Sequence, residues 1–200
     1  MKNKVLAILA NWSIKKNSTQ YKIISLIIGA IIFLMVFPVT FLQIGRVIEK
    51  SIIIHWNAWY EIIITIVTIP LGLSILFWTV FTQWVVGEGT PAPNAPTQKL
   101  ILVGPYRYCR NPIELGAIIY YLGFGTYFAS LTNGFVCCVL GLIIGSLYHK
   151  FIEEKELELR FGNEYIEYKK TTPFLFPRIR NLINYGVLPH YLYLQNVYGF

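Results

Sequence analysis

The sequence predicts an all-α integral membrane protein: a helical bundle of about four transmembrane helices with a cytoplasmic C-terminal extension. Apolar residues make up 55% of its 200 residues and charged residues only 14%, whereas about a quarter of an ordinary soluble protein is charged. The apolar residues come in long blocks without a visible internal repeat. We therefore expect residues 1–200 to form a single membrane domain.

The first half of the chain contains two blocks that are long enough to span a membrane. Residues 23–44 and 62–86 carry no charged side chain, and about 20 apolar residues suffice to cross the hydrocarbon core. Trp56, Trp59 and Tyr60 precede the second block, as aromatic side chains do at a membrane boundary. No small-residue cleavage site follows the first block, so we expect it to remain as an anchor.

The second half of the chain begins with a connection, residues 87–99, in which glycine and proline prevent a helix. Five such residues interrupt positions 87–99: Gly87, Gly89, Pro91, Pro93 and Pro96. This loop is either a plain connector or a lid. Two apolar blocks follow, 113–131 and 135–152, and the three residues between them predict a tight antiparallel hairpin. Helical character continues to Phe161, and Gly162 is the predicted stop.

The basic residues orient the bundle. All but two of the 17 lysines and arginines lie in the N-terminal segment, the 87–112 connection and the C-terminal segment; Arg46 and Lys50 lie in the 45–61 loop. Positive charge stays on the cytoplasmic side, so both termini are predicted to be cytoplasmic, in a prokaryotic plasma membrane or an endomembrane. The same distribution explains the net charge of +7 without a nucleic-acid partner. The three cysteines lack metal-ligand spacing, and no metal site is predicted.

Two polar clusters flank the predicted hairpin. One precedes it and comprises Tyr106, Arg107, Tyr108, Arg110, Asn111 and Glu114; the other follows it and comprises His149, Glu153, Glu154 and Glu158. A hairpin returns the chain to its starting side, so the clusters should be neighbours within a helix-packing distance. A site there could admit a polar cofactor from the cytosol and a lipophilic substrate from the bilayer. No ionisable residue lies in the middle of a block, which disfavours a transporter.

These clusters carry a family resemblance. Residues 104–112 read Gly-Pro-Tyr-Arg-Tyr-Cys-Arg-Asn-Pro, and Glu153, Glu154, Leu157, residues 161–165 and Tyr168 follow after the hairpin. This pattern resembles the isoprenylcysteine carboxyl methyltransferase and phospholipid methyltransferase group over about residues 87–180. The resemblance implies a membrane methyltransferase that uses S-adenosylmethionine to methylate a lipophilic or lipid-anchored acceptor at the cytoplasmic face.

The resemblance also implies the site residues. The expected cofactor-binding residues are Tyr106, Tyr108, Arg110, Asn111, Pro112, Leu115, Gly116, Glu153, Glu154, Tyr165 and Arg178, and the expected catalytic residues are Arg110 and Glu154. Aromatic faces and carboxylates suit a sulfonium, and an arginine suits the carboxylate of the donor. Methyl transfer itself requires mainly in-line positioning, so a sparse site suffices.

Several of these residues allow more than one interpretation. Asn111 stands where the family often has histidine, and Glu114 where it commonly has an aromatic; we interpret Glu114 as a cap of the helix after Pro112. Glu156 and Glu158 are interpreted as surface charges, and His149 as a structural group or a base. The acceptor could be a prenylated cysteine carboxylate, an amine, a thiol or another lipophile. The rival functions are a membrane reductase of the sterol-reductase type and a non-enzymatic lipid-binding subunit, and the oligomeric state is open.

Overall fold

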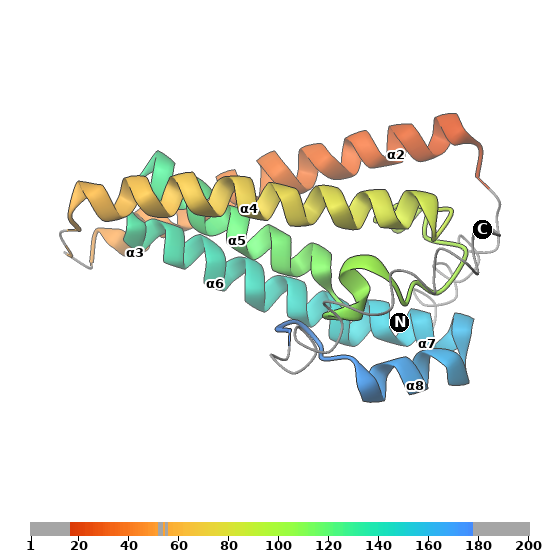
Figure 1. The fold of residues 1–200 in the computed structure, drawn as a ribbon. Coiled ribbons are helices and arrows are strands. Elements are labelled where there is room, and N and C mark those ends of the chain that lie inside the picture. The colour runs from red at the N-terminus through yellow and green to blue at the C-terminus, as the bar shows by residue number, and fades with distance from the viewer. Residues whose placement is uncertain (1–16, 52–53, 55, 178–200) are drawn as a thin grey trace, which may run out of the picture.

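The regular elements of the protein are helices throughout the part of the chain that the structure describes. That structure is a computed structural model describing residues 17–51, 54 and 56–177 (Figure 1). In chain order the elements are α2 (Thr19–Ile31), the π-turn η1 (Ile32–Val36), α3 (Phe37–Glu49), α4 (Ala58–Val85), the 3₁₀ turn η2 (Gly104–Arg107), α5 (Pro112–Phe128), α6 (Leu131–Tyr148), the π-turn η3 (His149–Glu153), α7 (Glu154–Phe161) and α8 (Asn163–Thr171). The predicted all-helical membrane bundle is confirmed.

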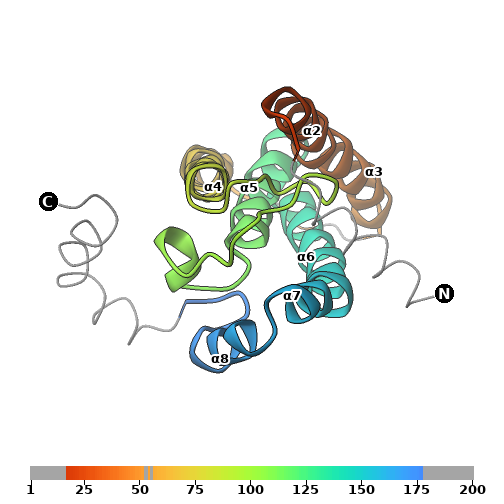
Figure 2. The same ribbon diagram turned by 90° about the vertical axis from the view of Figure 1, so that its right-hand side faces the viewer.

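Three helices within the described ranges are long and apolar enough to cross a membrane: Thr19–Glu49, Ala58–Val85 and Leu131–Phe161. The fourth predicted span, block 113–131, stays a prediction, because its helix is shorter than these three. This block forms α5, whose 17 residues extend roughly 25 Å at about 1.5 Å per residue, short of a core about 30 Å thick. Most of its residues are buried, because α5 lies between α4 and α6 (Figure 2).

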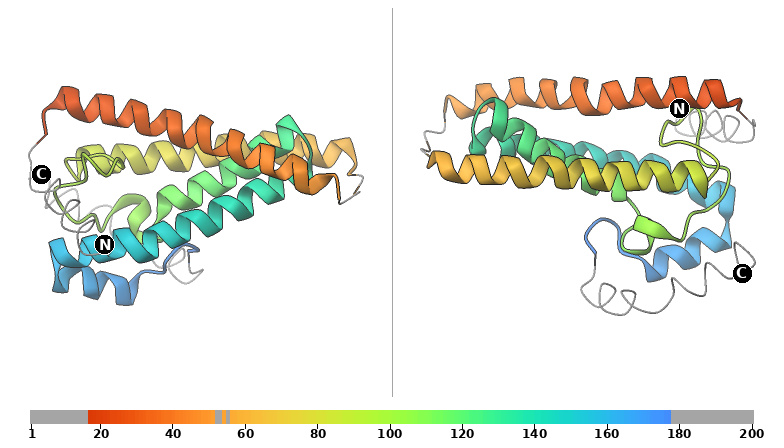
Figure 3. Two further views of the ribbon diagram at one scale, coloured as in Figure 1. Left: turned by 180° about the vertical axis from the view of Figure 1, so that it is seen from behind. Right: turned by 45° about the horizontal axis from the view of Figure 1, so that its top comes forward.

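The first span is one long rod with a π-turn in its middle. Pro38 has no backbone N–H, and its ring displaces the carbonyl of residue 34 from regular α-helical bonding. Two tyrosines of α5 bind the carbonyl oxygens released there: the hydroxyl of Tyr120 donates to Leu34 O at 3.1 Å, and that of Tyr121 donates to Phe33 O at 2.9 Å. These bonds fix the position of the long α2–α3 helix along the axis of the bundle (Figure 3).

The hairpin between α5 and α6 turns three residues earlier than the sequence predicts. Ala129 and Ser130 form the connection, whereas residues 132–134 lie inside the first turns of α6. Ser130 is the N-cap, because its side chain accepts a hydrogen bond from Asn133 N at 3.1 Å, and its hydroxyl also donates to Glu49. A serine cap satisfies a helix N–H that would otherwise lack a partner.

Ser130→Ala is expected to lower the free energy of unfolding by about 1 kcal/mol, since it removes this cap. Thermal unfolding of the detergent-solubilised protein measures the effect. Ser74→Ala is the control, because Ser74 is exposed and bonds only the Pro70 carbonyl of its own helix. Equal stability of the two variants would contradict the role of the cap.

The polar segments gather at one end of the bundle, which we call the polar end. It consists of residues 86–111 and 149–177 together with the start of α2 (Figures 1 and 3). The α6 helix continues through η3 into α7, and the chain reverses at Gly162, whose φ of +55° favours glycine. The predicted stop at Gly162 is confirmed. The reversal packs α8 beside α7. The two predicted polar clusters meet through the Arg110–Glu154 and Glu114–His149 contacts.

Candidate active site

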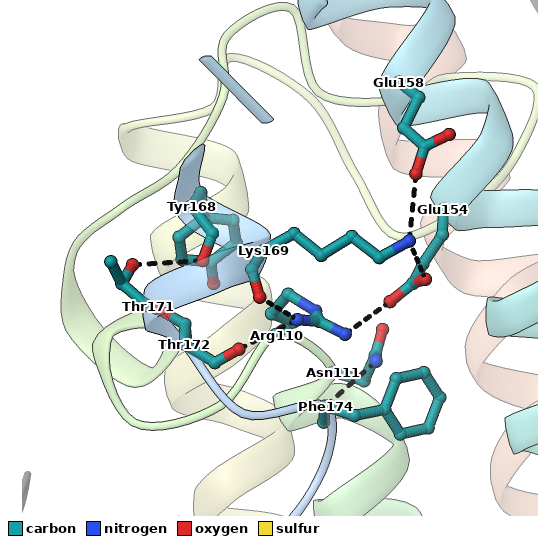
Figure 4. Close-up of polar contacts among 9 residues, drawn as sticks. All are labelled: Arg110, Asn111, Glu154, Glu158, Tyr168, Lys169, Thr171, Thr172 and Phe174. Carbon is teal, nitrogen blue, oxygen red and sulfur yellow. Dashed lines mark hydrogen bonds and ion pairs between the residues drawn. The ribbon is translucent and has the colours of Figure 1, made fainter. Parts of the chain in front are cut away.

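Arg110 is the centre of the site and joins three segments (Figure 4). Its Nη2 donates to Glu154 Oε1 of α7 at 2.8 Å, and its Nη1 donates to the carbonyl oxygens of Lys169 and Thr172 at 2.7 and 2.9 Å. The Arg110 and Glu154 side chains are 11% and 6% exposed. A planar guanidinium suits this forked set of acceptors. The arginine therefore fastens the end of α8 to α7 and to the loop before α5.

Lys169 extends the charged network along α7. Its Nζ lies 2.7 Å from Glu154 Oε2 and 2.9 Å from Glu158 Oε1. The hydrogen bond to Glu154 raises the pKa of Lys169. Helical i,i+4 spacing would offer Lys150 as a neighbour of Glu154, but the partners in the structure, Arg110 and Lys169, are distant in the chain. Glu158, interpreted as a surface charge, is half-buried and paired.

The backbone after α8 closes over the loop that precedes α5. Arg110 N donates to Pro173 O at 2.9 Å, and Asn111 N donates to Phe174 O at 3.2 Å. The Asn111 side chain adds a bond from its Nδ2 to Phe174 O at 3.0 Å. The ring of Phe174 lies 5.8 Å from the Arg110 guanidinium carbon. Asn111 thus holds the closing segment in place.

Three tyrosines line the inner side of this closure. The Tyr168 hydroxyl donates to Tyr106 O at 2.6 Å, and Tyr165 is only 1% exposed. Burial raises the pKa of Tyr106, Tyr165 and Tyr168 well above the usual range, so all three are neutral. Tyr108 lies apart from them, with its ring centroid 6.1 Å from that of Trp78.

A cavity adjoins the site on the other side of Tyr106. Its volume is about 60 Å³, well below the roughly 300–1,000 Å³ typical of small-molecule sites, so a ligand of cofactor size enters only if the walls move apart. It is lined by Gln83, Thr90, Pro91, Ala92, Pro93, Pro96, Thr97, Tyr148, Glu153, Glu156, Leu157 and Arg160. Of the predicted site residues, only Glu153 lines it.

Gln83 is the wall residue that sequence reasoning missed. Its Nε2 contacts the Tyr106 hydroxyl oxygen at 2.6 Å, but its Oε1 has no hydrogen-bond partner although the residue is only 8% exposed. A buried amide oxygen without a partner is costly, and a ligand in the cavity could supply one. The sequence feature that could have indicated it is the position of this glutamine near the end of the charge-free block 62–86.

The 87–99 loop forms one wall of the cavity. It is held to α4 by a bond from Gly89 N to Gln83 O at 3.1 Å and to α7 by a bond from Arg160 to Thr97 O. Asn94 joins it to α2 through Ser25 at 3.0 Å. Of the two readings of this loop, the ordered contacts favour a closing wall over a plain connector.

A second polar group lies deeper, between α5 and α6. Glu114 Oε1 accepts a hydrogen bond from Ser146 Oγ at 2.6 Å, and Glu114 Oε2 lies 3.7 Å from His149 Nε2. The other ring nitrogen of His149 contacts Glu153. Glu114 does lie in the first turn of α5, but the predicted helix cap is wrong, because its carboxylate bonds the neighbouring helix.

Other predicted residues have packing roles. A Cβ atom on Gly116 would meet Leu76 Cγ of α4 at 2.9 Å, so this glycine permits close helix packing. Pro112 is buried at the first position of α5, and Leu115 on the same helix is half-buried; neither lines the cavity. Arg178 lies outside the described residues.

Glu156 is a further correction. The sequence suggested a surface charge, but Glu156 is buried and paired with Arg160 at 2.9 Å, one turn along the same helix. Its carboxylate is therefore compensated, as a buried charge must be. The Arg160 guanidinium carbon also lies 4.8 Å from the Phe161 ring.

The described residues contain no group of three or more histidine, cysteine, aspartate or glutamate side chains that could hold a metal ion. Cys109 is buried near the site, and burial raises its pKa to about 12. Its thiol is therefore protonated at neutral pH and a poor nucleophile.

Comparison with known proteins adds an independent finding. Residues 60–164 match the family model described as phospholipid methyltransferase. Over 91 residues, 44% of this chain and 31% of each relative, the chain is 33% identical to the protein-S-isoprenylcysteine O-methyltransferases of Mus musculus and Rattus norvegicus. Over 82 residues, 40% of this chain and 36% of the relative, it is 35% identical to the cobalt-zinc-cadmium resistance protein CzcN of Cupriavidus metallidurans. The matched segments thus cover about a third of the length of these relatives.

Proposed function

Because the chain belongs to the phospholipid methyltransferase family, we propose that it transfers a methyl group from S-adenosylmethionine to a lipophilic or lipid-anchored acceptor at the cytoplasmic membrane face. One observation carries the proposal: the Arg110–Glu154 network lies at one end of an apolar bundle and beside a polar cavity. This arrangement offers a polar cofactor and a lipophilic acceptor a common meeting point.

The residues at the polar end suit the cofactor. The unpartnered Gln83 Oε1 is an acceptor for an amino or hydroxyl group, and Glu153 and Tyr148 give the cavity a carboxylate and an aromatic face. Carboxylates and aromatic faces attract cations such as a sulfonium. When bound, S-adenosylmethionine supplies an electrophilic methyl group.

Arg110 and Glu154 have a different part in this proposal. Both side chains hold the segment after α8 in place. Of the nitrogen and oxygen atoms of these two side chains, only Arg110 Nε lacks a hydrogen-bond partner among the described residues. We assign them the positioning of the cavity wall and of Tyr106, which lies between the network and the cavity. Excluding water and holding two reactants in line is the main requirement of methyl transfer.

The membrane orientation follows the charge distribution. The polar end holds the lysines and arginines that lie within residues 99–110 and 150–170, so it faces the cytoplasm under the positive-inside rule. Both termini, which lie outside the described residues, belong to the same side in this proposal. A cytoplasmic cavity mouth would give the cofactor direct access, while the acceptor would arrive through the lipid.

Titration calorimetry of S-adenosylmethionine with the purified, detergent-solubilised chain tests the proposal. We expect saturable binding by the parent and an affinity about tenfold lower for Gln83→Leu, because a lost hydrogen bond is worth about 1–1.5 kcal/mol.

The matched control is Gln43→Leu, the same substitution at an exposed position of α3, which should bind like the parent. A nicotinamide cofactor is titrated alongside. Binding of the nicotinamide cofactor alone would support a reductase instead, and binding of neither would overturn the proposed enzymatic function.

A further inference from the structure

An apolar groove lies at the end of the bundle opposite the polar end, where α3 ends and α6 begins (Figure 1). Its volume is about 390 Å³, within the roughly 300–1,000 Å³ typical of small-molecule sites. Its walls include Ile48 at the end of α3, Trp56 before α4, and Phe135, Val136 and Val139 of α6. The proposed function does not use this groove.

Trp56 is fixed as one wall of the groove. Its Nε1 donates to Thr132 Oγ1 at 2.8 Å, and its ring centroid lies 6.5 Å from that of Phe135. A tryptophan at a membrane boundary commonly turns its N–H toward the headgroups, but here the N–H and the threonine hydroxyl bind one another. The groove therefore offers a ligand an apolar surface.

The groove follows a membrane-spanning helix. Thr132 and Leu140 are its first and last residues on α6, which belongs to the span Leu131–Phe161. Between them the helix rises roughly 12 Å at about 1.5 Å per residue, slightly less than one leaflet, which is half of a core about 30 Å thick. An acyl chain that runs along α6 within one leaflet therefore fits the groove in length and in polarity.

Lys50 lies at the mouth of the groove. In the sequence it stands between Ile48 and Ile54, which both line the groove, and its side chain is exposed. A lysine near the end of a span extends its charged end toward the headgroups while its methylene stem stays in apolar surroundings. A positive charge is thus available where the headgroup of a lipid in the groove would lie.

The acidic residues of this end bind elsewhere. Glu49 accepts a hydrogen bond from Ser130, and Glu61 accepts one from Leu131 N at 2.9 Å. Both carboxylates therefore lie at the start of α6, where negative charge suits the helix dipole. Lys50 forms no ion pair within the described part of the chain, so its charge is free to attract an anion.

We propose that the groove between α3 and α6 binds one acyl chain of an anionic phospholipid whose phosphate pairs with Lys50, in the leaflet opposite the polar end. This site is separate from the cavity and does not depend on methyl transfer. The bound chain would contact α3, α6 and the segment before α4 together, so the lipid would stabilise the folded bundle by binding it in preference to the unfolded chain.

Native mass spectrometry of the detergent-solubilised full chain tests the proposal with two phospholipids that carry the same oleoyl chains. Phosphatidylglycerol is the anionic probe and phosphatidylcholine the zwitterionic one. We expect saturable binding of one phosphatidylglycerol, and a dissociation constant about fivefold higher for phosphatidylcholine. Lys50→Gln should remove this preference. Lys155→Gln, at an exposed lysine of α7 at the polar end, is the control and should keep it.

Val139→Trp tests the groove itself, because the larger side chain should fill it and prevent binding of this one lipid. Ile144→Trp is the matched control: Ile144 is also an exposed residue of α6, but it does not line the groove. Should Val139→Trp not fold, phosphatidylglycerol with brominated acyl chains provides a second measurement. It should quench the tryptophan fluorescence of the parent, and Trp56→Phe should lose part of this quenching.

Three results would overturn the proposal. Equal affinity of the parent for the two phospholipids would exclude recognition of the headgroup by Lys50. Lipid binding by Val139→Trp at the level of the parent, or equal quenching in the parent and Trp56→Phe, would place the lipid elsewhere on the bundle. A dimer of the parent that Val139→Trp abolishes would assign the groove to a second copy of the chain.

Discussion

Arg110→Ala is expected to lower the free energy of unfolding by about 3–5 kcal/mol, the typical cost of removing one partner of a buried ion pair. The substitution leaves the Glu154 carboxylate with Lys169 alone and deprives the carbonyl oxygens of Lys169 and Thr172 of their donor. The segment after α8 should then detach. Thermal unfolding in detergent measures the stability, and limited proteolysis near residues 172–177 reports the detachment.

Two comparisons separate the structural role of Arg110 from a role in cofactor binding. Arg46→Ala is the control, because Arg46 is exposed at the opposite end and makes one bond, to Phe128 O at 3.3 Å. The double variant Arg110→Met with Glu154→Met should recover most of the stability, since apolar replacement of a buried pair is often neutral. Cofactor binding by this double variant should stay weak if the charges of Arg110 and Glu154 position the binding site. An Arg110→Ala variant as stable as Arg46→Ala would refute the argument.

The fold was largely predictable because it depends on local patterns. Charge-free blocks predict the spans directly, and Gly162 marks a chain reversal that only a glycine adopts without strain. The burial of α5 was not predictable from its apolar block, because hydropathy does not distinguish contact with lipid from contact with other helices. Ser130 was missed as a cap because Thr132, Asn133 and Gly134, which follow shortly after it, are themselves typical of a turn.

The site was predictable in its location but less so in its contacts. Two motifs joined by a hairpin had to meet, and they do. The partner of Glu154 could not be derived, because Arg110 lies 44 residues away and Lys169 reaches it only after the chain reverses. Rules based on i,i+4 spacing favour local partners such as Lys150. The roles of Gln83 and Glu114 depend in the same way on which helix faces which, and a single sequence does not contain this information.

Close packing of α4 on α5 yields the second large effect: Gly72→Ala is expected to destabilise the protein by about 1–3 kcal/mol through overpacking. The added Cβ would lie 2.6 Å from Tyr120 N and 2.8 Å from Gly116 O. Both are backbone atoms of α5, so relief requires the two helices to separate. Separation would also disturb the Tyr120 bond to the π-turn and widen the polar end, so cofactor affinity should fall with stability.

Gly29→Ala is the matched control for this overpacking. Gly29 also lies inside a helix, but a Cβ atom there meets nothing within 4 Å. The same substitution gains helix propensity worth up to about 1 kcal/mol at both positions, so the difference between the variants isolates the contact between α4 and α5. Thermal unfolding of both proteins in one detergent gives this difference. Because the helix preference is common to both, equal unfolding temperatures would mean that α4 and α5 are not packed as closely as Gly72 requires.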